Sequence, residues 1–491
     1  MFSIHWQASV DDDPSYYGGV VFAHYASPCI TAANTVVQTY RFTTVVGGSN
    51  DYDNWRVIAR SGETGKVIWS YSTDYSATLV YPADWTTIYP MGLTNSNTLA
   101  FAGGGGTVLH RSADLATAPV TRLSFYQKYG NYLSDPSAFS GIKICTPITG
   151  DGKGDIWFGY LVNGSCPTAV ANAIGSGGFV TINAAGVATF MPVSALKLSG
   201  GPARPSLDSA PAVTANGEFM YGTVSDGGGG TDYIVKLNAT TLALVASASL
   251  LDPSDGGTAP TINESSASPM IGPDGHLFMG VFRNNYGESH GWMLQFDQNL
   301  KQTNASGKQY PVGSFGWDDT AVVVPSKIVP SYKGASTYLI LTKYNNYDIG
   351  TGNGQNKVAV LDPSANNISK DRQTGIPVMN EILTVLGPTH DAGSSIPGAV
   401  REWCINSAAI DVANKSAIIN SEDGHVYRWS FVTNSLIELI NLQPATSEAY
   451  TCTAIGPDGQ CYALNNAILF AVGMIQPTGG TISPPTRTRS R

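Results

Sequence analysis

Short runs of small and apolar residues recur along the chain, and each is followed by a turn and then by a β-branched or aromatic run. Four examples are SPCITAANTVVQTY (27–40), YPMGLTNSNTLAFAG (89–103), CTPITGDGKGDIWFG (145–159) and SAPAVTANGEFMYGT (209–223). Four more are SASPMIGPDGHLFMG (266–280), KIVPSYKGASTYLIL (327–341), NSAAIDVANKSAIIN (406–420) and TCTAIGPDGQCYAL (451–464). Their turns are rich in Asn, Asp and Gly, which supply the positive φ that tight hairpins need. The pattern predicts eight β-hairpins, about one every 60 residues.

A second pair of strands follows most of these hairpins, as in WRVIARSGETGKVIWSYS (55–72) and YIVKLNATTLALVASASL (233–250). Four strands per repeat, with a small-residue strand first, are typical of a β-propeller blade, whose innermost strand lies near a crowded axis. We therefore expect an all-β fold, a single β-propeller of four-stranded blades over residues 1–474. Eight blades fit the repeats best, and seven are the alternative.

The two ends of the chain favour a closed ring. The last repeat has a hairpin and a third strand, AILFAVG (467–473), but no fourth strand. FSIHWQA (2–8) can supply it, so that the N- and C-terminal strands pair. Residues 475–491 are rich in Pro, Thr and Gly and read as a linker or tail. The best candidate for a helix is PVMNEILTVLG (377–387).

The composition excludes several classes of protein. Charged residues make up 13% of the 491 residues, and 54 Gly and 24 Tyr suit strands and turns better than long helices. A net charge of −9 argues against a general nucleic-acid binder. No stretch approaches 18 apolar residues, so we expect no transmembrane segment. Residues 1–14 lack the features of a signal peptide, so the chain is either cytosolic or a mature form without its leader.

Cysteines and glycosylation sequons favour the second alternative, an extracellular (secreted or cell-surface) protein. None of the six cysteines forms a CxxC zinc pattern, and we expect local pairs between Cys145 and Cys166 and between Cys452 and Cys461. The other two are Cys29 and Cys404. The sequons are at Asn163, Asn238, Asn263, Asn304, Asn367 and Asn414.

One segment carries a family resemblance. ARSGETGKVIW (59–69) resembles the tryptophan-docking motif A-x-D-x-x-T-G-K-x-x-W of the quinoprotein-dehydrogenase-like (PQQ-like) β-propellers, with Ser61 in place of Asp. The resemblance implies that the Thr64-Gly65 turn joins the third and fourth strands and that Trp69 packs between neighbouring blades. Later blades lack the T-G-x-x-x-W ending, and the adjacent cysteines of the alcohol-oxidising members are missing. We therefore identify the chain as a non-dehydrogenase member and predict no cofactor; pyrroloquinoline quinone (PQQ) is disfavoured.

A second segment, TGDGKGDIWFG (149–159), resembles the calcium loop of integrin-type FG-GAP propeller repeats. Asp151 and Asp155 match two ligand positions, whereas Pro147 and Thr149 stand where carboxylates are expected. A calcium site at Asp151 and Asp155 and a simple Gly-rich hairpin turn both remain open.

Ligand-binding candidates come from the loops that lead into the innermost strands and from those that join second and third strands. Both sets crowd one face of a propeller around its axis. The candidates are His24, Tyr25, Trp85, Asp208, Glu264, Trp317, Asp318, Lys343, Tyr344, Arg401, Glu402, Trp403, Glu448 and Tyr450. Aromatic rings beside carboxylates and amides suit a glycan or an extracellular protein partner.

The sequence thus predicts an extracellular binding or structural module. The alternative is a carbohydrate-active enzyme, a polysaccharide lyase or hydrolase with its site in the propeller mouth; a quinone-dependent oxidoreductase is a weaker alternative. A His or Tyr base beside Arg or Lys would suit a lyase, and paired carboxylates would suit a hydrolase. GxSxG, HExxH and P-loop motifs are absent. In EDGHVYRWSF (422–431), His425 follows a turn and stays a secondary candidate.

Overall fold

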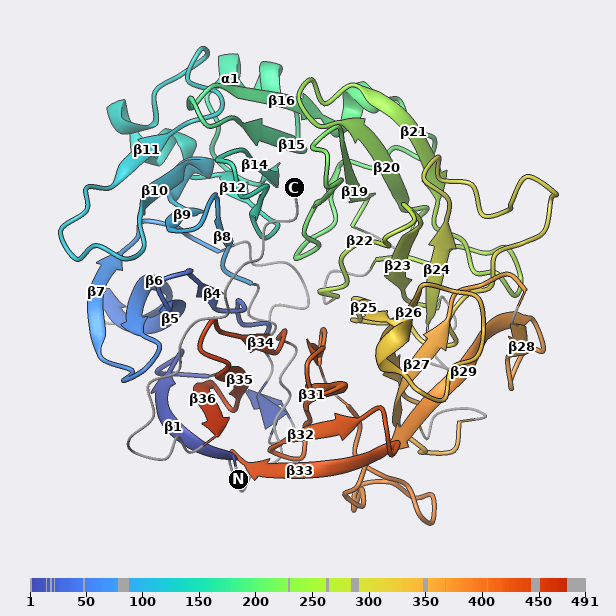
Figure 1. Cartoon of the computed structure of the whole chain (residues 1–491). Coiled ribbons are helices and arrows are strands. Elements are labelled where there is room, and N and C mark those ends of the chain that lie inside the picture. The colour runs from blue at the N-terminus through green and yellow to red at the C-terminus, as the bar shows by residue number, and fades with distance from the viewer. Residues whose placement is uncertain are drawn as a thin grey trace, which may run out of the picture.

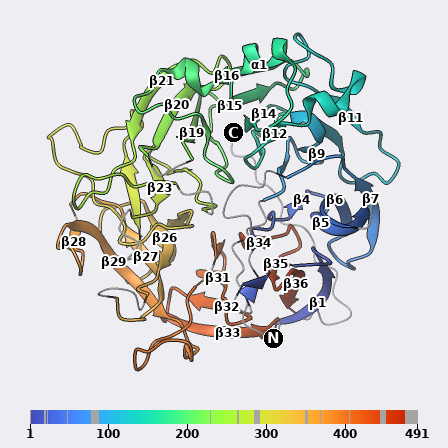
Figure 2. The same cartoon turned by 180° about the vertical axis from the view of Figure 1, so that it is seen from behind.

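In the computed structural model the chain forms a ring of β-sheets around a central axis (Figure 1). The structure describes residues 2–14, 16–17, 20–21, 23–46, 49–77, 88–227, 230–261, 265–283, 291–347, 352–366, 368–403, 405–442 and 451–474. Eight of the sheets that these residues form are the blades, which follow one another around the ring in chain order and appear in the opposite sense from behind (Figure 2). The predicted eight-bladed β-propeller is confirmed.

The blades fill their strand positions in the same order. The innermost strands, from blade 1 to blade 8, are β4 (Cys29–Ile30), β8 (Met91–Leu93), β13 (Thr149–Gly150), β18 (Ala212–Val213), β22 (Met270–Ile271), β25 (Val322–Pro325), β30 (Ala409–Asp411) and β34 (Ala454–Ile455). The second strands are β5 (Thr35–Val46), β9 (Thr98–Ala102), β14 (Ile156–Val162), β19 (Phe219–Ser225), β23 (Leu277–Val281), β26 (Tyr338–Tyr344), β31 (Ser416–Asn420) and β35 (Cys461–Asn465).

The outer strands complete the blades. The third strands are β6 (Ser49–Ser61), β10 (Val108–Ser112), β15 (Gly177–Ile182), β20 (Tyr233–Asn238), β24 (Trp292–Phe296), β27 (Lys357–Asp362), β32 (His425–Ser430) and β36 (Ile468–Met474). The fourth strands are β7 (Val67–Ser72), β11 (Thr121–Leu123), β16 (Ala188–Pro192), β21 (Leu244–Ser249), β29 (Pro377–Leu386), β33 (Ser435–Asn441) and β1 (Phe2–Ser9). In the described part of blade 5, a single bridge between Met293 and Gly313 takes the fourth position.

Some elements stand outside this plan. In blades 3 and 4 the inner position is divided, with β12 (Ile142–Ile144) before β13 and β17 (Arg204–Pro205) before β18. The remaining elements are β28 (Ile368–Lys370) beside β29, the hairpin β2 (Tyr16–Tyr17) and β3 (Val20–Val21), helix α1 (Thr168–Ile174) and the 3-10 turns Gly104–Gly106, Tyr132–Ser134, Pro136–Phe139, Val193–Leu196 and Ser326–Ile328.

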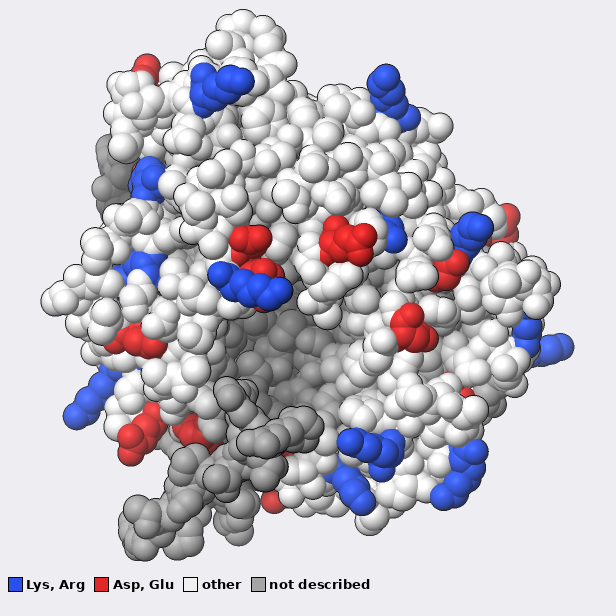
Figure 3. Space-filling model, turned by 45° about the horizontal axis from the view of Figure 1, so that its top comes forward, with Lys and Arg blue, Asp and Glu red and all other residues white. Residues whose placement is uncertain are grey.

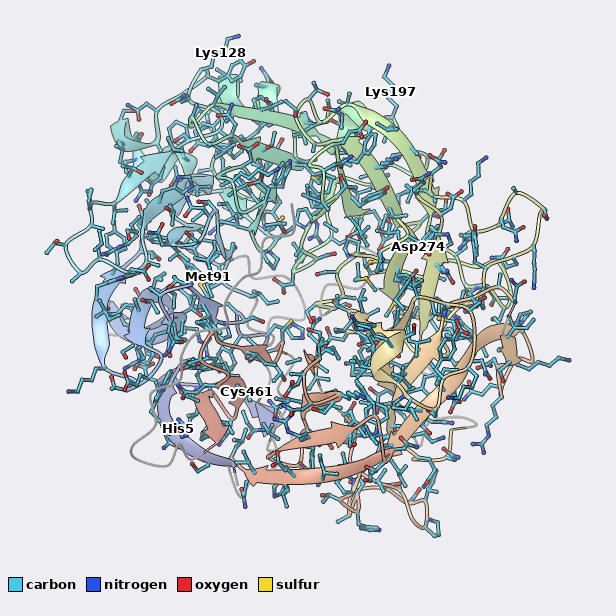
Figure 4. All side chains as sticks on the ribbon, in the orientation of Figure 1. His5, Met91, Lys128, Lys197, Asp274 and Cys461 are labelled. Carbon is cyan, nitrogen blue, oxygen red and sulfur yellow. The ribbon has the colours of Figure 1, made fainter. Side chains whose placement is uncertain are left out.

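Close contact at the axis explains the small residues of the innermost strands. A Cβ atom added to Gly92 would lie 2.0 Å from the carbonyl oxygen of Ile148, and one added to Gly150 would lie 2.0 Å from that of Leu93. The backbones of β8 and β13 can meet only because neither glycine has a side chain. Met91 on β8 lies toward the centre of the ring, whereas Lys128 and Lys197 stand at its rim (Figure 4).

The ring closes as predicted. β1 pairs with β36 in antiparallel register, with Ser3 opposite Gly473 and Gln7 opposite Phe470. The N-terminal strand is therefore the fourth strand of blade 8. Residues 475–491 lie outside the described residues, and their linker role stays a prediction.

Two local predictions are wrong. Residues 377–386 form strand β29 instead of a helix. Pairing with β27 and β28 outweighs the apolar spacing, and Val378, Met379 and Leu383 are buried in the resulting sheet. The expected disulfides Cys145–Cys166 and Cys452–Cys461 are also absent. All five cysteines that the structure describes are free. Cys461 is enclosed within β35, and the Cys452 sulfur lies 3.3 Å from the Asn406 side-chain oxygen.

The tryptophan of the docking motif joins two blades. Thr64 and Gly65 lie in the turn between β6 and β7, and the Trp69 indole N–H donates a 2.6 Å hydrogen bond to the Ala113 carbonyl. Ala113 directly follows β10, the third strand of blade 2. The Arg111 guanidinium covers the Trp69 ring at 3.7 Å. The packing implied by the resemblance is therefore present.

The same kind of bond recurs with other donors. Trp6 on β1 donates to the Gly62 carbonyl, after the third strand of blade 1, at 2.6 Å. From second strands, Trp157 donates to the Ala239 carbonyl at 2.7 Å and Tyr221 to the Gln298 carbonyl at 3.0 Å. We call these four contacts the docking bonds. In each, a buried or half-buried aromatic side chain satisfies a carbonyl that follows the third strand of the next blade.

Trp69→Phe should lower the free energy of unfolding by about 1–3 kcal/mol, because it leaves the buried Ala113 carbonyl without its donor. Trp6→Phe should cost less, since the Gly62 carbonyl also accepts a hydrogen bond from the Gln460 side chain. Urea unfolding measures both effects. The control Tyr129→Phe, at an exposed ring, should stay within about 0.5 kcal/mol of wild type. An equally small effect of Trp69→Phe would contradict the role of the docking bonds.

Candidate functional site

Three of the predicted site residues meet at the axis. His24 precedes β4, Asp208 precedes β18 and Asp318 precedes β25, so they come from blades 1, 4 and 6. The His24 Nε2 atom lies 3.3 Å from Asp318 Oδ2, and its Nδ1 atom lies 4.0 Å from Asp208 Oδ2. All three side chains are buried, with exposures of 1–6%. The imidazole of blade 1 thus lies between carboxylates of blades 4 and 6.

The two aspartates share an unusual backbone conformation. Asp208 has φ 57° and Asp318 has φ 54°, in the left-handed region that Asp tolerates better than most residues. Hydrogen bonds hold this conformation. Asp318 Oδ1 accepts bonds from the backbone N–H (2.5 Å) and the hydroxyl (2.6 Å) of Ser266, and Asp208 Oδ1 accepts one from the Ile88 N–H (3.1 Å).

Further hydrogen bonds connect this cluster to the remaining blades. The Asn406 amide donates to the Ser266 carbonyl at 2.9 Å, and the Asp208 N–H donates to the Cys145 carbonyl at 3.0 Å. The Thr453 N–H donates to the Ser407 carbonyl, and the Thr451 hydroxyl donates to the Tyr25 carbonyl. We call the whole set the axial network. It comprises His24, Tyr25, Ile88, Cys145, Asp208, Ser266, Asp318, Asn406, Ser407, Thr451 and Thr453, and it connects all eight blades.

The carboxylates of the axial network differ in protonation. Burial raises the pKa of Asp208 to about 7, and nearby Asp318 adds to the rise while His24 opposes it. Burial also acts on Asp318, but His24, Lys343 and the Ser266 hydrogen bond outweigh it and lower the pKa to about 2. Asp319 is enclosed so completely that burial raises its pKa well above the ordinary value. Near neutral pH, Asp318 is therefore the charged partner of His24.

Lys343 and Glu402 extend the charged cluster toward blade 6. Lys343 is a buried residue of β26 whose charge stabilises the ionised forms of Asp318, Asp319 and Glu402. Burial raises the pKa of the half-buried Glu402, and the hydrogen bond from the Tyr347 hydroxyl (2.7 Å) opposes the shift. The charged groups of the cluster therefore interact mainly with one another.

Four more predicted residues have partners inside the protein. The buried Tyr25 hydroxyl donates to Asp11 at 2.8 Å. Trp403 is 0% exposed and packs edge-to-face against Tyr427 in the core. Arg401 pairs with Asp391 and Glu422, and the half-buried Trp317 packs against Phe282 and Tyr347. The other predicted residues Trp85, Glu264, Glu448 and Tyr450 lie outside the described residues.

Asp151 and Asp155 act as turn caps. Asp151 Oδ1 accepts hydrogen bonds from the N–H groups of Lys153, Gly154 and Asp155, and Asp155 Oδ1 accepts one from Ala184. No group of three or more His, Cys, Asp and Glu side chains suited to a metal ion occurs in the described part of the chain. His425 begins strand β32 directly after a turn, and its Nδ1 atom lies 3.1 Å from Asp423 Oδ1.

A cavity of about 110 Å³ lies in blade 6. Its lining runs from the segment after β26, across the start of β27, to the turn after β28. We call it the blade-6 cavity; its lining residues are Ser314, Tyr344, Asn345, Asn346, Tyr347, Asn353, Gln355, Lys357, Lys370, Asp371, Arg372, Gln373 and Glu381. Of the predicted residues that the structure describes, Tyr344 alone is in this lining.

The missed residues carried weak signals in the sequence. Asn345 to Gln355 lie in a segment rich in Asn, Tyr and Gly between two strands, a composition typical of a binding loop. The segment from Lys370 to Gln373 gave no comparable signal, because its approach to the cavity depends on how β28 packs beside β29.

The cavity is better suited to binding than to proton abstraction by Tyr344. Burial and the neighbouring Glu381 carboxylate raise the pKa of this hydroxyl far above its ordinary value. A general base needs a pKa near the working pH. Tyr344 is therefore a poor base for a lyase, whereas its ring and the surrounding amides remain usable as contacts.

The protonation of Asp208 should make stability depend on pH. The pKa of Asp208 in the folded protein, about 7, is above the ordinary value of 3.8. The protonated Asp208 side chain therefore contributes fully to the free energy of unfolding below pH 3.8, and this contribution is lost as the pH rises through 7. Asp318 acts oppositely and loses its contribution as the pH falls from 3.8 through 2. Asp208→Asn mimics the protonated acid. In this variant the free energy of unfolding should fall less between pH 5 and pH 8, by on the order of 1 kcal/mol, as measured by urea unfolding. An unchanged pH profile would contradict this assignment.

Comparisons with known proteins give a likeness of fold. No family model and no curated protein matches the sequence. Among solved structures, a europium-containing methanol dehydrogenase has a TM-score of 0.52 at 10% identity over 94% of this chain and 84% of that chain. BamB from Moraxella catarrhalis has 0.48 at 11% identity (96% and 100% covered), and the C-terminal WD40 domain of Sif2 has 0.49 at 8% (97% and 99%). The eight-bladed propeller of this chain is therefore similar in overall fold to the methanol dehydrogenase, and the fold implied by the resemblance at residues 59–69 is present.

Proposed function

We propose that this protein is a binding module that holds a glycan or a protein ligand at the blade-6 cavity and the loops around it. One observation carries the proposal. The described side chains at the axis are used in a buried hydrogen-bonded network, whereas the blade-6 cavity is lined by tyrosines, amides and charged side chains. Concave sites with a few convergent polar groups are the usual places for ligands.

An unsatisfied atom in the cavity supports this proposal. The Gln373 side-chain oxygen is buried and has no hydrogen-bond partner within the described structure. Buried polar groups are nearly always paired, so such an atom requires a partner from outside the protein or an ordered water. Its position in the lining makes a bound ligand a natural source of that partner.

Catalysis at the axis is the weaker alternative. His24 is 1% exposed and held between two carboxylates, so a substrate would have to displace the axial network to reach it. Lys343 is equally enclosed. The described part of the axis therefore favours a structural role for these groups.

The outer surface suits uncharged or weakly charged contacts. On the face shown in Figure 3, Lys, Arg, Asp and Glu side chains are scattered among uncharged residues. No described helix is long and apolar enough to cross a membrane. The extracellular location stays part of the proposal, supported by the exposed sequon residues Asn163 and Asn414 and not by the cysteines, whose five described members are free.

The test is a glycan array and an extracellular-protein array, probed with the wild-type chain and with Gln373→Leu. We expect the wild type to bind at least one class of ligand. Gln373→Leu should bind it about tenfold more weakly, because it removes one hydrogen-bond acceptor from the cavity. Its stability should not fall, since that acceptor has no partner in the protein.

Gln127→Leu, at an exposed rim position, is the matched control and should bind like the wild type. Absence of binding on both arrays would refute the proposed function. Binding that Gln373→Leu leaves unchanged would show that the ligand sits elsewhere.

A further inference from the structure

The blade-6 cavity has cationic side chains without carboxylate partners. Lys357, Lys370 and Arg372 line it, and none of them forms an ion pair within the described part of the chain. Lys370 and Arg372 are exposed and Lys357 is half-buried. This gathering of three positive side chains contrasts with the chain as a whole, whose net charge is −9.

The two carboxylates of the lining are already engaged. Asp371 Oδ2 accepts hydrogen bonds from the Thr374 N–H and hydroxyl, both at 2.8 Å, and from the Gln373 N–H at 3.1 Å. Burial and the charge of the nearby Glu381 carboxylate both raise the pKa of the Tyr344 hydroxyl, so these two groups of the lining act on each other. The groups that remain for a ligand are therefore mainly cations and amides.

Amide groups supply the neutral contacts. The Asn346 and Asn353 side-chain oxygens accept backbone N–H bonds at 3.2 and 3.1 Å, while their amino groups donate to no described residue. Gln373 adds an unpaired acceptor. Donors and acceptors side by side match the hydroxyl groups of a sugar, each of which both donates and accepts.

We propose that the blade-6 cavity binds an acidic sugar, one ring of a glycan that carries a carboxylate or a sulfate. The inference rests on the proposed function and names the ligand class for the same site. Lys357 and Arg372 neutralise the anionic group, Asn346, Asn353 and Gln373 bond the hydroxyls, and the rings of Tyr344 and Tyr347 form part of the wall. A volume of about 110 Å³ has room for several water molecules, which a bound sugar would displace.

The test compares probes that differ in charge alone. Calorimetry measures the affinity of the full chain for oligogalacturonate and for its methyl ester, which has the same skeleton without the negative charge. A second arm uses a sulfated chondroitin oligosaccharide and its unsulfated form, to distinguish a sulfate from a carboxylate. The acidic member of at least one pair should bind about tenfold more tightly than its less charged counterpart, and that difference should shrink with added salt.

Charge-removing variants locate the effect. Lys357→Gln and Arg372→Gln should each weaken binding of the acidic probe about fivefold or more, because each removes one cation from the cavity. Lys128→Gln is the control, a lysine at the rim of the ring (Figure 4), and should change affinity less than twofold, roughly the effect of one distant screened charge. Thermal unfolding checks that all three variants fold.

The outcomes separate this inference from the proposed function. Equal affinity for the members of both pairs, or no effect of Lys357→Gln and Arg372→Gln, overturns the acidic-sugar assignment. If neutral glycans or proteins still bind and Gln373→Leu weakens them, the proposed function stands without it. If nothing binds on either array, both fall.

Discussion

The structure depends on one constraint, namely that eight chain segments converge on a single axis where each polar group needs a partner. Leaving a buried N–H, C=O or carboxylate group without a partner lowers stability by roughly 1–3 kcal/mol or more. Glycines such as Gly92 allow the backbones to meet, and His24 connects two aspartates from distant blades. The axial network therefore explains why the titratable residues described at the centre, such as His24 and Asp318, are buried against one another.

Farther from the axis, polar backbone groups between neighbouring blades also need hydrogen-bond partners, and aromatic side chains supply them. A carbonyl is left after the third strand of a blade, and an aromatic N–H or O–H from the preceding blade satisfies it at four interfaces. The axial network joins the blades at the centre of the ring, and the docking bonds join neighbouring blades farther out. A loop that is needed for neither, such as the one between β26 and β27, can then vary in composition and hold a ligand.

The fold was largely predictable from local signals, because turn chemistry and small inner strands recur in every blade. Closure by residues 2–8 was predictable for the same reason. Trp157 as a docking donor was not, since it lies on a second strand and Trp69 on a fourth strand. Trp6 also lies on a fourth strand, but the residues around it share no motif with those around Trp69. Sequence also could not show that Trp403 points into the core, because a loop residue can face either way. The approach of Gln373 to the cavity depends on tertiary packing alone.

The axis is proposed to be structural and the blade-6 cavity to bind the ligand. The most direct test of this division is a crystal structure of the chain with a bound acidic oligosaccharide. We predict electron density for one sugar ring beside Gln373, with its anionic group near Lys357 and Arg372, and an unchanged contact between His24 and Asp318. Density for the sugar on the axis, with that contact broken, would contradict the account.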